Sequence, residues 1–279
     1  MKINGSLKAA LSKGHFVVTT EFYPPKEANK NEVEKRALVL KNVVDAVLVR
    51  DNPLAEVHMS PLATISILLN KGLKPIMHIG IRDKNRLAIQ SDILGASALG
   101  VKAFFCLEDC HQRVGDHPGA KAVFDLDCVQ LISIMKKIEH SFVGTRINPF
   151  AHPLELHLIN LSKKINAGVD FIQTMPVFDL ERFEEFISLI KEENLYLLAG
   201  VSPIKSWQAL QSMPKMNVPD SIVRRLKNSP ENKQAEEGIK ICVEIINALK
   251  EIKGVSGIHI FAPDWEESIP VLVHRANLK

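Results

Sequence analysis

A carboxylate stands near the end of the first strongly apolar segment of the chain. Glu21 lies within His15–Phe22 and is followed by Tyr23 and two prolines. A carboxylate in apolar surroundings is costly unless it is paired or used in chemistry. Desolvation raises the pKa of a glutamate, so Glu21 is a candidate general acid near neutral pH. The alternative is structural: Glu21 forms a salt bridge with a neighbouring strand end, for which Arg50 is the candidate.

A second group of polar residues follows two later apolar segments. The segment Leu107–Asp127 is rich in Asp, His and Gly and leads into a helix-like stretch. Asp125 and Asp127 are suited to capping that helix, but the segment holds more polar groups than capping requires. The segment Asn148–Pro153 adds an amide and a histidine. A role beyond helix capping is therefore expected for the first of these segments.

A third group combines a glutamine with a lysine-bearing helix. Gln173 lies toward the end of the apolar segment Val169–Met175, where its amide needs hydrogen-bond partners that a bound heterocycle could supply. On the preceding helical stretch, Asn160, Lys163 and Lys164 are three and four residues apart and share one side. Such a lysine pair is usually a solvated surface, and it is also suited to binding phosphates.

The elements that must position these residues alternate along the chain. Eight short apolar segments are each followed by a stretch with apolar residues at helical spacing. This alternation predicts parallel βαβ units, and eight units predict an α/β protein with a closed (β/α)8 TIM barrel. In that fold the chemistry lies at the carboxyl ends of the strands. The predicted strands are His15–Phe22, Ala46–Arg50, Lys74–Ile79, Val101–Leu107, Phe142–Asn148, Val169–Met175, Leu195–Val201 and Gly257–Ala262.

Composition limits the class of protein. The 279 residues contain no linker, which predicts one barrel domain over residues 1–279, with a leading helix in residues 1–14. Neither a membrane span nor a secretory signal is evident, so a cytoplasmic location without membrane binding is predicted. The net charge of +3 is spread over helix faces and does not favour nucleic-acid binding. The spacing of Cys106, Cys110 and His111 fits no ordinary zinc pattern, so no metal site is predicted.

Several motifs together resemble one known family. They occur in order, at family-like spacing, between about residue 15 and residue 265. Each is weak alone, but the ordered set resembles the methylenetetrahydrofolate reductases of the short, single-barrel bacterial kind. The motifs are Glu21–Pro25, Arg82–Arg86 with Gln90–Asp92 (similar to that family's third helix), Gly115–Asp127, Asn148–Phe150, Ala167–Thr174 with Pro176–Asp179, and Gly257–Ile260 (similar to its eighth strand).

The resemblance implies a flavin enzyme of one-carbon metabolism. Such reductases bind FAD at the top of the barrel, take electrons from NAD(P)H and pass hydride to 5,10-methylenetetrahydrofolate, giving 5-methyltetrahydrofolate. Glu21 matches the general acid that assists ring opening to an iminium, and Gln173 matches a substrate contact. Cys110 and Met213 are further candidates for the folate pocket. The positions expected to contact FAD are Arg50, His78, Glu108, Asp109, Phe124, Asp125, Asp127, Asn148, His152, Asn160, Lys163 and Lys164.

The chain departs from the family pattern on the flavin side. Asp109-Cys110 stand where relatives carry a Gly-Asp pair, Arg50 replaces a small hydroxyl residue, and Glu108 replaces Thr or Arg. Arg50 and Glu108 could pair across the barrel mouth and fill the volume of the flavin ring. Alternatively, Asp109 or Glu108 takes over the missing carboxylate, and Arg50 stabilises the reduced flavin.

Two functions therefore stay open. One is a flavin-dependent reductase of methylenetetrahydrofolate. The other is a flavin-free barrel that keeps the folate end, as a folate-binding methyltransferase or as a non-redox subunit of a one-carbon complex. A homo-oligomer, a partner subunit or a corrinoid protein is compatible with either function.

Overall fold

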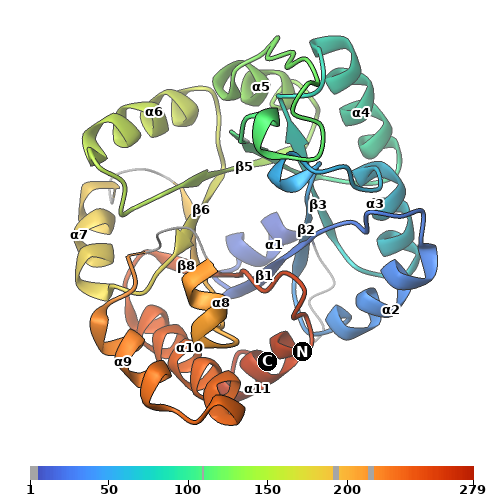
Figure 1. Ribbon diagram of the computed structural model, residues 1–279. Coiled ribbons are helices and arrows are strands. Elements are labelled where there is room, and N and C mark those ends of the chain that lie inside the picture. Colours follow the sequence, from blue (N-terminus) through green and yellow to red (C-terminus); the bar gives the residue numbers. More distant parts are fainter. Residues whose placement is uncertain (1–5, 109, 191–194, 213–216) are drawn as a thin grey trace.

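Eight parallel strands close into a barrel, as the alternating pattern predicts (Figure 1). The computed structural model describes residues 6–108, 110–190, 195–212 and 217–279. Each strand pairs in parallel with the next, and β8 closes the barrel on β1. The strands are β1 Val17–Phe22, β2 Ala46–Val49, β3 Pro75–Gly80, β4 Ala103–Leu107, β5 Phe142–Ile147, β6 Phe171–Pro176, β7 Tyr196–Val201 and β8 Val255–Ile260.

Helices surround the barrel and cover its outer face (Figure 1). Their apolar sides and the outward side chains of the strands form one large hydrophobic core. No helix within the described ranges is long and apolar enough to cross a membrane. The helices are α2 Lys30–Leu40, α3 Pro61–Asn70, α4 Arg86–Ala98, α5 Cys128–Met135, α6 Leu154–Asn166, α7 Leu180–Ile190, α8 Trp207–Ser212, α9 Asp220–Asn228, α10 Gln234–Glu251 and α11 Ser268–Arg275, with short 3-10 turns η1 Pro53–Ala55, η2 Gln112–Val114 and η3 Glu231–Lys233.

The start of α4 corrects one expectation from the sequence. The side chain of Asn85 accepts hydrogen bonds from the backbone N–H groups of Leu87 and Ala88, which is an N-cap. The helix therefore begins at Arg86. Assigning Arg82 to the third helix was wrong, because residues 82–85 form the loop that follows β3.

A short leading helix closes the amino-terminal end of the barrel. Helix α1, Leu7–Ser12, is capped by Ser6. Its apolar residues Leu7 and Leu11 belong to one buried cluster with Val17 and Leu48 from the strands. In Figure 1 this helix is seen through the ring of strands. The carboxyl end of the barrel is consequently the end left for chemistry.

An aromatic layer fills the middle of the barrel. The rings of Phe142 and Phe171 stack with centroids 5.0 Å apart. A Cβ at Gly144 would lie 2.2 Å from the Phe171 ring, so glycine is required at that position. Two residues further along β5 and β6, at the next inward positions, Arg146 and Gln173 are register partners. The polar residues of the mouth therefore rest on an apolar floor.

Candidate active site at the carboxyl end of the barrel

Glu21 is the centre of a buried ion cluster. Arg50 Nη1, from the end of β2, donates to Glu21 Oε1 at 3.0 Å. Arg146 Nη2, from β5, donates to the same oxygen. The side chains of Glu21, Arg50 and Arg146 are only 2%, 8% and 9% exposed. The interpretation of Glu21 as the salt-bridge partner of Arg50 is thus confirmed, and a second guanidinium joins the pair.

This cluster reverses the pKa expected for Glu21. Burial alone would raise its pKa, but the guanidinium groups of Arg50 and Arg146, together with the nearby ring of His259, more than offset burial. The pKa of Glu21 is held well below its ordinary value. The expectation of a protonated Glu21 near neutral pH is wrong for this arrangement. Glu21 is a carboxylate that can stabilise positive charge.

Tyr23 extends the cluster outward from β1. The Arg50 guanidinium carbon lies 5.7 Å from the centre of the Tyr23 ring, a cation–π arrangement. Burial and the negative charge of Glu21 raise the pKa of Tyr23. Tyr23 is therefore a neutral phenol at physiological pH, and it can donate a hydrogen bond.

His259 links Glu21 to Gln173. Its Nδ1 lies 2.9 Å from Thr19 Oγ1 and 3.1 Å from Gln173 Nε2. Because the amide nitrogen of Gln173 is a donor, Nδ1 accepts and the ring proton is on Nε2. That Nε2 is 3.7 Å from Glu21 Oε1. Burial lowers the pKa of His259, so the ring is neutral at pH 7.

Three buried polar atoms of this cluster keep unused hydrogen-bonding capacity. Within the described part of the chain, Arg146 Nε, Gln173 Oε1 and His259 Nε2 have no hydrogen-bond partner. Buried polar groups are nearly always paired, so each exception calls for an explanation. The cluster therefore holds one unused acceptor and two unused donors.

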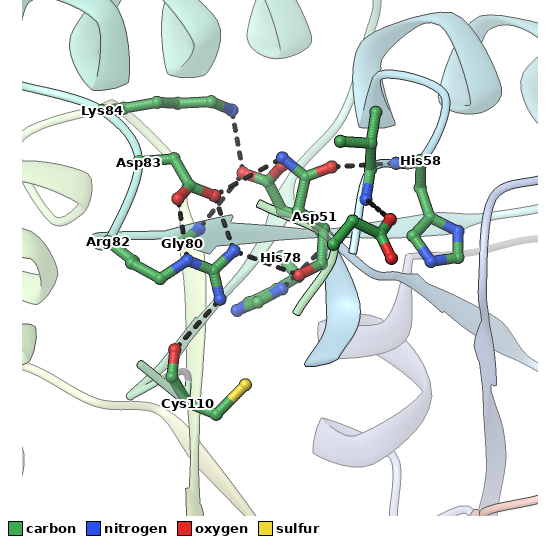
Figure 2. A network of polar contacts seen from close by, with 11 residues as sticks. Asp51, His58, His78, Gly80, Arg82, Asp83, Lys84 and Cys110 are labelled. Carbon is green, nitrogen blue, oxygen red and sulfur yellow. Dashed lines mark hydrogen bonds and ion pairs between the residues drawn. The ribbon is translucent and has the colours of Figure 1, made fainter. Parts of the chain in front are cut away.

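A second polar network lies over β2, β3 and β4, as Figure 2 shows. His78 Nδ1 accepts the backbone N–H of Asp51 at 3.0 Å. The Asp51 carboxylate accepts from Lys84 Nζ at 2.8 Å, and Lys84 also bonds Asp92 at 2.9 Å. Burial and the nearby Arg50 and Arg146 hold the pKa of His78 well below its ordinary value, so the ring is neutral.

A buried arginine, Arg82, connects three loops of this network, as Figure 2 shows. Arg82 donates to both carboxylate oxygens of Asp83, at 2.7 and 2.6 Å. It also donates to the backbone carbonyls of Cys110 and Asn52, at 3.1 and 3.2 Å. These bonds run from the β3 loop to the loops after β2 and β4. The network holds the rim in place.

Glu108 does not pair with Arg50, which contradicts the predicted bridge across the mouth. Glu108 Oε1 accepts instead from Lys164 Nζ at 3.2 Å and from Asn160 Nδ2 at 3.3 Å. Lys163 is exposed, whereas the side chain of Lys164 is buried. Two of the groups expected to hold the FAD ribose and phosphates therefore contact a carboxylate of the protein.

The remaining candidates for FAD contacts have local structural partners. The Asp125 carboxylate accepts hydrogen bonds from the backbone N–H and from the guanidinium Nε of Arg86, at 2.8 and 2.9 Å. Asp127 caps α5 in a reciprocal capping box with Gln130. The capping interpretation is thus confirmed for Asp127, whereas Asp125 caps no helix of its own.

Three further candidates lie elsewhere on the rim. Asn148 accepts a hydrogen bond from the backbone N–H of Phe150 at 3.0 Å, and His152 contacts Arg182 at 3.0 Å. The side chain of Phe124 is partly exposed.

Two predicted site residues, Asp109 and Met213, lie outside the described residues. Cys110 is exposed, and its carbonyl oxygen is bound by Arg82. Arg146 and His259 belong to the cluster, but neither was predicted from the sequence. Arg146 is a charged residue within a buried strand, so the reasoning applied to Glu21 would have found it. His259 carries no such signal, because a histidine between two isoleucines also fits a core.

Cavities do not by themselves mark this cluster. A cavity of about 260 Å³ on the rim is lined by residues of the loops after β2, β3 and β4, among them Asn52, Arg82 and His117. A larger cavity, about 850 Å³, lies between β6, β7, α7 and α10, and is largely aliphatic. We place the candidate site at the ion cluster, because it combines buried charge, unused hydrogen-bonding atoms and the carboxyl ends of the strands.

Comparison with known proteins gives one family. A family model described as methylenetetrahydrofolate reductase matches residues 6–277. A 5,10-methylenetetrahydrofolate reductase of Pectobacterium carotovorum subsp. carotovorum is 21% identical over 284 residues, covering 96% of this chain and 92% of that protein. A probable methylenetetrahydrofolate reductase (NADPH) of Caenorhabditis elegans is 22% identical over 223 residues, covering 74% of this chain. The aligned part is 33% of the nematode protein, so this chain spans about a third of that relative.

Solved structures share the fold. A 2,3-dimethylmalate lyase has a TM-score of 0.53 at 16% identity, covering 91% of this chain and 78% of that one. A tryptophan synthase from M. tuberculosis has a TM-score of 0.57 at 8% identity, covering 98% and 99%. At such low identity these structures support the barrel architecture alone.

Proposed function

This chain belongs to the methylenetetrahydrofolate reductase family, and from that premise we propose that it acts on the one-carbon unit of a tetrahydrofolate derivative. The pterin would rest over Glu21, Gln173 and His259. The observation that carries the proposal is the buried cluster at the carboxyl end of the barrel, whose Gln173 Oε1 and His259 Nε2 lack partners among the described residues. The relatives named above are reductases of 5,10-methylenetetrahydrofolate, which sets the expected substrate.

The state of Glu21 defines what it contributes to such a reaction. Opening of the five-membered ring breaks the bond between the methylene carbon and N10, and it leaves a cationic iminium at N5. A carboxylate fixed beside that cation stabilises it electrostatically. Reduction then needs a hydride on the carbon and a proton on N10. Because Glu21 is ionised, the proton comes from solvent or a second donor, and we assign the hydride to a reduced nicotinamide.

The residues present do not fit FAD in the manner that the family resemblance implies. Lys164 and Asn160, the groups for ribose and phosphate, are both bound to Glu108. A carboxylate at that point would repel a diphosphate. Arg50 is buried against Glu21 at the position of a small hydroxyl residue.

This misfit favours the flavin-free form of the function. One version is direct reduction by a nicotinamide. The second candidate is a folate-binding methyltransferase or a non-redox subunit of a one-carbon complex, which needs no hydride at this site. The occupied phosphate position at Lys164 favours either version over a flavoprotein. A cytoplasmic location, a homo-oligomer and a partner subunit stay predictions from the sequence.

Calorimetric titration of the purified chain with tetrahydrofolate tests the proposal. We expect binding, and we expect Gln173→Leu to weaken it at least about tenfold because a pterin hydrogen bond is lost. Gln90→Leu, an exposed change on α4, is the matched control and should leave the affinity unchanged. Absence of tetrahydrofolate binding by the unaltered chain would reject the folate site. A yellow protein with a full complement of FAD would reject the flavin-free form.

A further inference from the structure

Arg146 has more donors than its salt bridge uses. Its Nη2 binds Glu21, and its Nε is buried without a hydrogen-bond partner among the described residues. Gln173 is the register partner of Arg146 on β6 and has an unused acceptor: its Nε2 is bound to His259, and its Oε1 has no hydrogen-bond partner among the described residues. One unused donor and one unused acceptor therefore belong to side chains that point inward from adjacent strands.

We propose that Arg146 and Gln173 together read the cyclic amide edge of the substrate ring. A pyrimidinone such as that of a pterin carries an N–H beside a C=O. Gln173 Oε1 accepts from the ring N–H, and Arg146 Nε donates to the ring carbonyl. Arg146 is thus a specificity-determining residue. This inference rests on the proposed folate function and adds to it the group that selects the ring.

Both side chains are held in place before a ligand arrives. The guanidinium of Arg146 is fixed by Glu21 on one side and lies 4.9 Å from the centre of the Phe261 ring and 5.7 Å from that of Phe105. The amide of Gln173 is oriented by His259. A donor and an acceptor that cannot turn away discriminate strongly, because a mismatched ligand leaves them buried and unpaired.

A role for Arg146 as a mere counter-ion of Glu21 explains less. Arg50 already binds the same carboxylate oxygen at 3.0 Å. A counter-ion would also leave the buried Nε donor unused, at the cost that an unpaired buried donor carries. A preference for a 4-oxo ring over a 4-amino ring separates the two roles, because a counter-ion of Glu21 has no influence on which ring edge is bound.

The experiment compares two ligands by calorimetric titration: tetrahydrofolate, which has the 4-oxo ring, and its 4-amino analogue, which lacks the cyclic amide. We expect the unaltered chain to prefer the 4-oxo ligand at least about tenfold. Arg146→Met should reduce this preference to a few-fold, whereas the exposed Arg86→Met should preserve it. Arg146→Lys keeps a cation beside Glu21 but lacks Nε–H, and it should also lose the preference.

The outcomes separate this inference from the function on which it rests. If the unaltered chain binds neither ligand, the folate function fails. If it binds both equally well, the function stands and the amide-edge reading by Arg146 is overturned. Should Arg146→Met not fold, Arg146→Lys decides: a preference retained in that variant reduces Arg146 to a counter-ion.

Discussion

The two sides of the barrel mouth differ in how their buried polar groups are bonded. On the side of β1, β5, β6 and β8, the groups around Glu21 leave hydrogen-bonding atoms of Arg146, Gln173 and His259 unused in the described structure. Over β2, β3 and β4, Arg82 and Lys84 each bind several partners. Several unused buried groups at one place indicate a site for a ligand, whereas a dense network of this kind indicates structure, although Gln112 Oε1 has no hydrogen-bond partner there among the described residues.

This difference coincides with the departures from the family sequence pattern, which lie on the side expected to hold the flavin. The side expected to hold the folate is charged, buried and incomplete without a ligand. The side expected to hold the flavin is closed by contacts such as Glu108 with Lys164. A barrel can lose one ligand and keep another, because its loops are positioned independently by separate strands.

Removing the central carboxylate should have the largest effect on stability. Glu21→Leu leaves the guanidinium groups of Arg50 and Arg146 buried without their shared partner. Breaking a buried ion cluster in this way costs about 3–5 kcal/mol. The free energy of unfolding in urea measures this cost. Asp125→Ala, which breaks an exposed pair with Arg86, is the control and should cost within about 1 kcal/mol. Equal costs would remove the distinction between the two sites.

The pH dependence of stability tests the ionisation of Glu21. Its pKa in the folded chain is lowered, so the cluster contributes stability above the unfolded value of about 4.3 and loses it as pH falls through the folded pKa. Relative to Glu21→Gln, the native chain should keep a constant advantage between about pH 5 and pH 8 and lose it in acid. A general acid with a raised pKa predicts the opposite sign: the native chain would lose stability relative to the variant as pH rises toward 7.

Opening the flavin side should produce a gain in cofactor affinity. Arg50→Thr with Glu108→Thr removes the guanidinium from the mouth and frees Lys164 and Asn160 for phosphate. We expect the affinity for FAD, measured by quenching of flavin fluorescence, to rise at least about tenfold, or about 1.4 kcal/mol.

The same two residue types can be changed at a remote site as a control. Arg225→Thr with Glu244→Thr breaks an ion pair between α9 and α10 and should not alter FAD binding. An unchanged affinity in the mouth variant would mean that Arg50 and Glu108 are not what excludes the flavin.

The sequence predicted the barrel well and the site only in part. All eight strands were found, because each is a short apolar segment between helical repeats. The salt bridge between Glu21 and Arg50 could be predicted because a buried carboxylate is costly without a partner. The predicted pairing of Glu108 with Arg50 was wrong, because distances across a closed barrel depend on strand register and on loop paths that no local pattern encodes. The predicted direction of the Glu21 pKa shift was wrong for the same reason, because Arg146, which lowers this pKa, lies 125 residues away in the sequence.

The smallest effect is expected where the sequence offered two interpretations and the structure supports one. The Asp127 carboxylate accepts the backbone N–H of Gln130 at 2.7 Å, and the side-chain oxygen of Gln130 accepts the backbone N–H of Asp127 at 3.1 Å. Asp127→Ala should therefore cost about 1 kcal/mol of stability, the usual value of an N-cap, and leave the affinity for tetrahydrofolate unchanged. Thermal unfolding and calorimetric titration measure the two quantities on one sample. A loss of folate affinity with intact stability would move Asp127 from the structural side of the mouth to the binding side, and the boundary between the two sides would have to be drawn through the loop that precedes α5.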